Sequence, residues 1–401
     1  MGTIHDVRYF DSDMTGAPST AGMAAAGRFL AILDACAITG FNLKPVTSLT
    51  VAGGIATVTT DGDHGFRDTT VIRIEGATPE ALNGDWKVQV TAGNAFTFET
   101  TVPDGPATGT ISAKTAPLGW AKEFSATNVG VYRPKTGLRH FFRVGDTRSD
   151  YVSIRGYEVM TASGDAGTNP FPTTTQLSGG VGMSKYCGST SYQQKWFLIG
   201  DDRCLYFVFC PDDHLGVQQS HADWAIYGFG EAISYTPNDL GASFVIGSAV
   251  QSTTWTSAYQ NGSCYPSYFG SEIYSGCYFS RPYSQELGAP SRFRLAGSGV
   301  AHGWGSSSGA AGRTPLPNPA DLSMLFHYPI VMQEEISKAV RAEMPGAYQP
   351  LNVNMAARVG DVVTINGRKI LITHAYDNSS PGSSGTGKSG TMGWDITGPW
   401  R

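Results

Sequence analysis

An alternating stretch between residues 46 and 113 constrains the fold of this 401-residue chain more than any other feature. Apolar and polar side chains alternate there in several short segments; Leu49 and Val51, for example, point to one face, and their immediate neighbours point to the other. A period of two is typical of strands that bury one face. The pattern predicts that a single core contains Ile72, Ile74, Trp86 and Phe98.

Turn residues separate these alternating segments. The turns combine glycine with asparagine, aspartate or a second glycine, at Gly53-Gly54, Asp61-Gly62, Asn83-Gly84, Gly93-Asn94 and Asp104-Gly105. Such pairs supply a positive φ or a turn capped by a side chain. Short strands at this spacing, with no helical pattern between them, predict a small antiparallel sandwich or barrel.

The composition of the whole chain favours the same fold class. Glycine occurs 50 times and charged residues make up only 15% of the chain, while aromatic residues are plentiful. We therefore expect a mainly β protein of antiparallel sandwiches or barrels with one short N-terminal helix. The net charge of −5 gives no indication of nucleic-acid binding. The sequence has no apolar run of membrane-spanning length and begins without the pattern of a secretory signal.

The alternating stretch also resembles a β-domain that recurs in tail and baseplate proteins of tailed bacteriophages. The matching positions are Val51, Gly53, Gly54, Ala56, Thr57, Thr59, His64, Gly65, Phe66, Ile74, Gly76–Pro79, Leu82–Gly84 and Phe96–Phe98. A second string, which runs from Gly16 to Phe41, resembles the start of these phage proteins. The resemblance implies a tail-tip or baseplate structural protein of a long-tailed phage of the Mu-like siphophage type.

Changes in pattern along the chain predict four parts. Residues 1–45 form an N-terminal arm and helix, and residues 46–115 form the small β-sandwich domain. Residues 116–345 form a central β-sandwich domain with long loops rich in Gly, Ser and Tyr. Residues 346–401 form a C-terminal β-hairpin and tail segment.

The predicted helix follows an extended, polar arm over residues 1–18. Ser19 or Thr20 can cap the helix and Gly40 can end it. An apolar stripe at three- and four-residue steps consists of Met23, Phe29, Leu30, Leu33 and Cys36. The helix either packs on its own domain or, with the arm, docks a neighbouring subunit.

Later segments add further strands. Two apolar runs flank a Gly-Asp-Asp-Arg turn at residues 200–203 and predict a hairpin buried on both faces, whose Asp201 and Asp202 we expect to be exposed. Asn366-Gly367 between two apolar segments is a strong hairpin signal. Residues 324–343 fit either a helix or a strand, and the resemblance implies an extended segment.

No catalytic or nucleotide-binding motif occurs in the sequence, so we expect no enzymatic activity, no cofactor and no metal. The best metal-like cluster has no recognised spacing and reads as a solvated loop; it comprises Asp212, Asp213, His214, His221 and Asp223. The cysteines form no C-x-x-C pair, which favours free thiols. A disulfide between Cys264 and Cys277 across a hairpin is the alternative.

Aromatic residues are the candidate interaction surface, because their rings offer flat apolar faces with a polar edge. The candidates lie in the arm, in the loops between residues 260 and 285 and at the C-terminus: Tyr9, Phe10, Tyr265, Tyr268, Tyr274, Tyr278, Tyr283, Trp394 and Trp400. The loop tyrosines either pack the loops onto the sandwich or bind a sugar or protein. The terminal aromatics either dock a neighbouring subunit or fold back onto their own domain.

The combined expectation is a non-enzymatic virion protein of the phage tail, assembled in the cytoplasm of the bacterial host. It would act by assembly with other tail or baseplate proteins, as a homo-oligomer such as a trimer or hexamer, and could be an attachment platform for fibres. The alternative is a receptor-binding protein whose loops between residues 180 and 312 contact a host glycan or pilus. A glycan-cleaving enzyme is a third hypothesis and needs a pair of carboxylates in a cleft.

Overall fold

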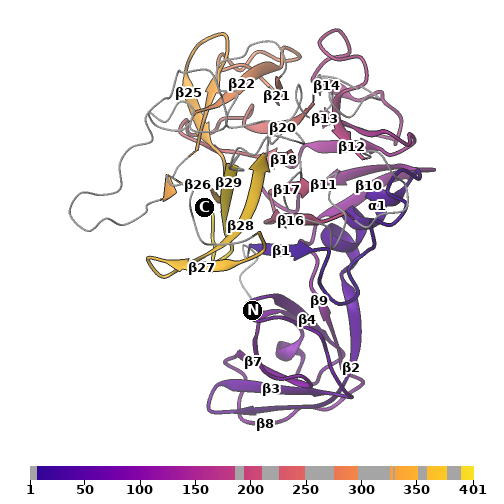
Figure 1. Cartoon of the computed structure of the whole chain (residues 1–401), viewed down its shortest axis with the longest axis vertical. Coiled ribbons are helices and arrows are strands. Elements are labelled where there is room, and N and C mark those ends of the chain that lie inside the picture. Colours follow the sequence, from indigo (N-terminus) through magenta and orange to yellow (C-terminus); the bar gives the residue numbers. More distant parts are fainter. Residues whose placement is uncertain are drawn as a thin grey trace, which may run out of the picture.

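The computed structural model describes residues 7–185, 194–209, 225–248, 275–296, 326–327, 330–350, 359–376 and 390–401. These residues form a mainly β structure with one short α-helix, as the sequence predicts, and every strand pair among them is antiparallel. The alternating domain lies at one end of the molecule, below the larger body in Figure 1. No helix among the described residues is long and apolar enough to cross a membrane.

The small domain is an eight-stranded sheet in the order β5-β4-β9-β2-β3-β7-β6, with β8 paired to β2. Its strands are β2 (Phe41–Ala52), β3 (Ile55–Thr60), β4 (Val71–Glu75), β5 (Gly84–Lys87), β6 (Gln89–Ala92), β7 (Ala95–Glu99), β8 (Gly105–Pro106) and β9 (Ser112–Thr115). A 3-10 turn at Glu80–Leu82 precedes β5. One core contains Ile72, Ile74, Trp86 and Phe98, as predicted. Trp86 stacks on Phe98 with ring centroids 4.6 Å apart.

The body is built on a sixteen-stranded sheet. Its strands before residue 200 are β1 (Arg8–Asp11), β10 (Ala121–Ala126), β11 (Val129–Arg133), β12 (Phe141–Gly145), β13 (Tyr151–Val159), β14 (Thr168–Phe171), β15 (Val181–Ser184) and β16 (Trp196–Gly200). Those after it are β17 (Cys204–Phe209), β18 (Ala225–Glu231), β19 (Ile233–Ser234), β20 (Ser243–Ser248), β21 (Ser275–Phe279), β22 (Ser291–Ala296), β24 (Val331–Glu334) and β25 (Val340–Glu343). The hairpin β16–β17 is buried on both faces, as predicted.

A five-stranded sheet follows in the order β23-β26-β29-β28-β27. Its strands are β23 (Phe326–His327), β26 (Ala347–Pro350), β27 (Val362–Ile365), β28 (Arg368–Tyr376) and β29 (Gly390–Asp395). Asn366 (φ 50°) and Gly367 (φ 78°) form the predicted tight turn between β27 and β28. Strands β24 and β25 show that residues 331–343 are extended rather than helical, with turn residues between them.

The helix α1 (Arg28–Asp34) begins later than the sequence predicts and runs into a π-helical turn at Ala35–Thr39. Ser19 and Thr20 do not cap it. Gly27 lies at the N-cap with φ 81°, and Oδ2 of Asp146 accepts hydrogen bonds from the N–H groups of Phe29 (2.8 Å) and Leu30 (3.4 Å). A cap from a distant residue leaves no local signal, which is why the predicted start was wrong.

A buried ion pair holds this helix against the body. Lys185 and Asp146 are ion-paired, and both side chains are fully buried. Nζ of Lys185 also donates to the carbonyls of Ala25 and Arg148, each at 2.9 Å. The ammonium therefore joins the turn before the helix to the loop before β13, and the helix buries its apolar face within its own chain.

Two large apolar cores lie among the described residues, beside a smaller cluster of Val131, Phe141, Tyr157 and Met160. One lies within the small domain, and the other combines side chains from the N-terminal arm, the helix, the central strands and the C-terminal sheet. The arm is not a free extension: β1 pairs with β16 of the same chain, which buries Tyr9 and Phe10. The N-terminal strand, the central strands and the C-terminal sheet therefore fold around one shared core.

Polar contacts link the small domain to the body, in addition to strand β2, which is a single uninterrupted strand. Asp85 of β5 accepts hydrogen bonds from Arg8 (2.7 Å) of β1 and from Arg73 (2.6 and 2.9 Å) of β4. Nζ of Lys87 donates to the carbonyls of Ile396 (3.0 Å) and Thr397 (3.3 Å) near the C-terminus. The small domain is thus fastened to both terminal segments of the chain by charged side chains.

Replacing Asp85 with asparagine is expected to lower the free energy of unfolding at pH 7 by about 1–3 kcal/mol, because two guanidinium groups lose their carboxylate. Burial alone raises the pKa of Asp85, but the bonds from Arg73 and the charge of Arg8 outweigh it and lower the pKa. A lowered pKa stabilises the fold above the unfolded value of about 3.9, and this stability is lost as the pH falls through the folded value.

Urea unfolding between pH 7 and pH 2.5 measures both effects. The wild type should lose more stability on acidification than Asp85→Asn, so the two curves should converge at low pH. Asp61→Asn, at an exposed turn of the same domain, is the matched control and should leave the midpoint unchanged. Parallel curves for the wild type and Asp85→Asn would contradict the ionic link.

Candidate functional site

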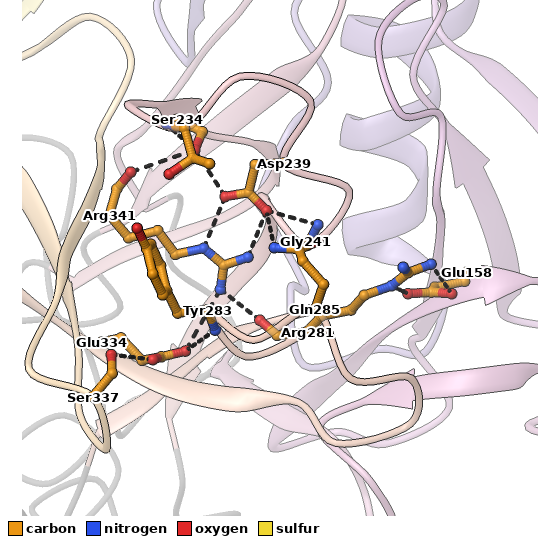
Figure 2. Close-up of polar contacts among 11 residues, drawn as sticks. Glu158, Ser234, Asp239, Gly241, Arg281, Tyr283, Gln285, Glu334, Ser337 and Arg341 are labelled. Carbon is orange, nitrogen blue, oxygen red and sulfur yellow. Dashed lines mark hydrogen bonds and ion pairs between the residues drawn. The ribbon is translucent and has the colours of Figure 1, made fainter.

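The most extensive polar network among the described residues surrounds the guanidinium of Arg341 on β25. Arg341 is fully buried, and its Nε and one terminal nitrogen donate to the two carboxylate oxygens of Asp239 at 2.8 and 2.6 Å. The other terminal nitrogen donates to the carbonyl of Arg281 at 2.6 Å and lies 3.6 Å from the carboxylate of Glu334. Figure 2 shows the guanidinium between the two acids. The guanidinium also lies over the ring of Phe279, 4.7 Å from its centroid.

Asp239 is held by donors from three segments. In addition to Arg341, the hydroxyl of Ser234 (2.8 Å), the N–H of Gly241 (2.9 Å) and the side-chain amide of Gln285 (2.8 Å) donate to it. Burial raises the pKa of Asp239, but the hydrogen bonds and charge of Arg341 outweigh it and lower the pKa below the ordinary value. The carboxylate therefore stays ionised and fixes the loop that contains it.

Glu334 and Arg281 extend the network to neighbouring strands. The N–H of Tyr283 donates to Glu334 at 2.7 Å, and the hydroxyl of Ser337 donates to the same carboxylate. Arg281 forms a two-bond ion pair with Glu158 of β13, with one bond of 2.9 Å. Burial raises the pKa of Glu158, but the hydrogen bonds from Arg281 and Asn169 and the charge of Arg281 lower it overall.

Strand register places three loops that contain residues of this network at one end of the sixteen-stranded sheet. Antiparallel pairing sets the start of β20 beside the end of β21, the start of β22 beside the end of β24, and the start of β25 beside the end of β19. The loops 235–242, 280–290 and 335–339 therefore project from the same edge. We call them, together with Val340, the apex. The network joins all three, because Asp239, Tyr283 and Ser337 each belong to a different loop.

The chemistry of this network is structural. The carboxylates of Asp239 and Glu334 are buried and are bonded to donors from the protein itself. A general acid or base must reach a substrate proton directly or through one water. The network instead orders the apex loops, so the exposed side chains on those loops are the candidate functional surface.

Exposed apolar side chains concentrate at the apex. Among the described residues, ten large apolar side chains are exposed, and six of them lie there: Tyr235, Leu240, Tyr283, Leu287, Ile336 and Val340. Ile336 at the hairpin tip is 82% exposed. Exposed apolar side chains that gather in one region of a soluble protein often mark an interaction site.

The structure assigns most of the predicted aromatic surface to the interior. Trp394 is fully buried and Trp400 nearly so, and their indole N–H groups donate within the chain, to Thr373 (2.8 Å) and to the carbonyl of Asp395 (2.8 Å). Tyr9 and Phe10 are buried in β1, and Tyr278 is buried in β21. These five side chains are therefore not an exposed surface, because large rings gain most by filling the shared core.

Tyr283 is the predicted surface residue that the structure exposes, at 49%, and it belongs to the apex. Tyr265, Tyr268 and Tyr274 lie outside the described residues. The metal-like cluster Asp212, Asp213, His214, His221 and Asp223 also lies outside them. Within the described ranges, no group of three or more metal-ligating side chains could hold an ion.

Asp201 and Asp202 correct a further expectation, since both are buried rather than exposed. Asp201 accepts hydrogen bonds from the N–H groups of Arg203 and Cys204 at 2.8 Å and pairs with the guanidinium of Arg401. Asp202 accepts a bond from the hydroxyl of Thr136. Arg401 covers this turn. The sequence around the turn could not predict this burial, because the partner is 200 residues away in the chain.

The cysteines Cys36, Cys204 and Cys277 are buried. Burial raises the pKa of the Cys36 and Cys204 thiols well above the ordinary value. Cys264 lies outside the described residues, so the disulfide alternative with Cys277 stays a prediction.

Sequence reasoning missed Arg341 and Asp239, which organise the apex. Asp239 follows Pro237-Asn238 in a segment with the composition of an ordinary turn. Arg341 lies in a short strand whose sequence has no unusual pattern. The one usable signal is an arginine between Val340 and Ala342, where a buried strand position requires a paired charge.

No protein-family model matches the sequence, and no curated protein matches it.

Proposed function

We propose that this chain is a non-enzymatic structural protein of a phage tail tip or baseplate, which acts by assembly with other tail proteins and with copies of itself. The observation that carries the proposal is the string between residues 51 and 98 that resembles the recurring tail and baseplate β-domain. Two features of the structure support the view that the residues of this string determine the fold of the small domain.

The first feature is that residues of the string have demanding structural positions. Gly76 has a φ of 81°, and a Cβ atom there would lie 2.1 Å from the carbonyl oxygen of Thr110, so only glycine fits. Asn83 exchanges two 2.8 Å hydrogen bonds with the backbone of Ala77. His64 is buried, and its Nδ1 accepts a 2.9 Å bond from the N–H of Phe66. These three matching positions therefore have roles that the fold of the domain requires.

The second feature is that this domain has its own core and protrudes from the body, as Figure 1 shows. A module that carries its own core can be combined with different bodies, which suits a domain that recurs in a class of assembly proteins. The cytoplasm of a bacterial host is reducing, and the buried, high-pKa thiols of Cys36 and Cys204 are compatible with folding there.

Immunogold electron microscopy tests the proposal. Antibody against the purified chain should label the distal end of the tail on particles induced from a host that carries the gene. A deletion of the gene should yield particles without complete tails. If the purified particles lack the protein, or if the deletion leaves tails and infectivity intact, the assembly proposal is wrong.

The same material distinguishes the receptor-binding alternative. A receptor-binding protein added in excess should block adsorption of intact particles to host cells, while its absence should leave tail assembly complete. An assembly protein should give the opposite pair of results, with tails lost and adsorption of wild-type particles unaffected by the free protein.

A further inference from the structure

We propose that the apex is a self-association surface, which binds the apex of a second copy of this chain across a two-fold axis. The inference rests on the assembly function proposed above and names a surface and a partner for it. Three observations carry it: the exposed apolar side chains of the apex, the rigidity of its loops and the arrangement of its charges.

The apolar side chains come from all three loops. Tyr235 and Leu240 lie on the first, Tyr283 and Leu287 lie on the second, and Ile336 is at the tip of the third. The exposed fractions of these five range from 48% to 82%. Removal of such side chains from water is the main driving force of protein association. A surface with this content is matched by another apolar protein surface.

The loops are ordered before any partner binds. Backbone groups of the apex are tied to the buried network: the N–H of Tyr235 donates to the carbonyl of Arg341 (2.9 Å), and the N–H of Tyr283 donates to Glu334 (2.7 Å). The N–H of Glu335 donates to the carbonyl of Arg292 (2.9 Å). Association of ordered loops avoids much of the entropy cost that flexible loops would incur.

The charges decide which partner fits. Within the apex, which the structure describes completely, the charged side chains in the most exposed class are one acid, Glu286, and one base, Lys338, and a second acid, Glu335, is half-exposed in the same loop as Lys338. Glu286 and Lys338 lie on different loops. An apolar surface that exposes both an acid and a base is complementary to itself, because in a two-fold contact Lys338 of each copy can face Glu286 of the other. A partner surface with one predominant charge would face no surface of the opposite charge here.

Analytical ultracentrifugation of the full chain tests the proposal. The wild type should form a reversible dimer, and Ile336→Asp should raise the dissociation constant at least tenfold, because a carboxylate would be buried in an apolar contact. The high exposure of Ile336 means that the monomer should fold unchanged, which near-ultraviolet circular dichroism checks. Leu43→Asp is the matched control: Leu43 is 65% exposed but lies on β2 of the small domain, and the dimer should be unaffected.

A charge exchange tests the two-fold arrangement. Lys338→Glu should weaken the dimer, and the double variant Lys338→Glu with Glu286→Lys should restore it. A wild type that stays monomeric at about 100 μM overturns self-association, as does an equal loss with Leu43→Asp. A dimer that the double variant fails to recover overturns the two-fold pairing.

Incorporation into particles separates this inference from the proposed function. If the wild type is monomeric but Ile336→Asp alone is excluded from particles, the apex binds a different tail protein; the self-association inference then fails and the assembly proposal stands. If the chain dimerises through the apex but is absent from particles, the assembly proposal fails and the interface stands.

Discussion

Replacing Trp394 with alanine is expected to lower the free energy of unfolding by about 3–5 kcal/mol, the cost of removing a fully buried aromatic side chain. Trp394 has no exposed surface, its ring centroid lies 4.9 Å from that of Tyr206, and its indole N–H donates to Thr373. The variant would leave a cavity where the C-terminal sheet meets strand β17 of the body, and it would remove the donor to a buried hydroxyl.

Urea unfolding of the wild type and Trp394→Ala, each at several protein concentrations, measures this loss. Because the indole packs inside its own chain, the difference between the two midpoints should not depend on protein concentration. Val362→Ala, on the exposed edge strand of the same sheet, should change the free energy by less than about 0.5 kcal/mol. A difference that appears only at concentrations where the chain associates would restore Trp394 as an intersubunit contact.

Replacing Arg341 with methionine is expected to cost a similar amount, about 3–5 kcal/mol, for an electrostatic reason. Methionine keeps the unbranched apolar part of the side chain, but the carboxylates of Asp239 and Glu334 would remain buried without their cation. The apex loops would also lose the group that joins them. Lys338→Met is the matched control, because Lys338 is exposed on the same hairpin and its charge has little effect on the fold.

The dependence of this effect on pH gives a second measurement. In the wild type, burial raises the pKa of Asp239, but the hydrogen bonds and charge of Arg341 outweigh burial, so the pKa is lowered overall. Asp239 therefore stabilises the fold above about pH 4, and this stability is lost on acidification. Without Arg341, burial is expected to raise the pKa of Asp239, and protonation at low pH would relieve the penalty. The difference between wild type and Arg341→Met should therefore shrink as the pH falls. A constant difference from pH 7 to pH 3 would show that Arg341 acts through packing alone.

The apex experiments can be combined with this variant. If the network holds the apex loops in place, Arg341→Met should also weaken the apex dimer, although Arg341 itself is buried and cannot touch a partner. Hydrogen exchange should then show faster exchange at the amide of Tyr283, whose acceptor is Glu334. An unchanged dissociation constant together with unchanged exchange at Tyr283 would mean that the loops keep their order without the guanidinium.

Local patterns in the sequence determined the strands of the small domain and several hairpins. Alternation around Ile72, Trp86 and Phe98 predicts their shared core, because a period of two sends every second side chain to the same face wherever the strand pairs. Asn366-Gly367 predicts its turn because both residues tolerate a positive φ. These features depend on neighbours in sequence, so the sequence alone is sufficient for them.

Tertiary structure decided the positions of the charges and of the terminal aromatics. Asp239 and Arg341 are 102 residues apart, and Asp146 caps a helix 117 residues away. Trp394, for which the sequence left both docking to a neighbouring subunit and packing on its own domain open, lies inside the body. The choice of such partners depends on which strands become neighbours and in which register, and a single residue surrounded by ordinary turn or strand sequence contains no record of that choice. The long-range pairing of the strands therefore placed the buried charges and, with them, the apex.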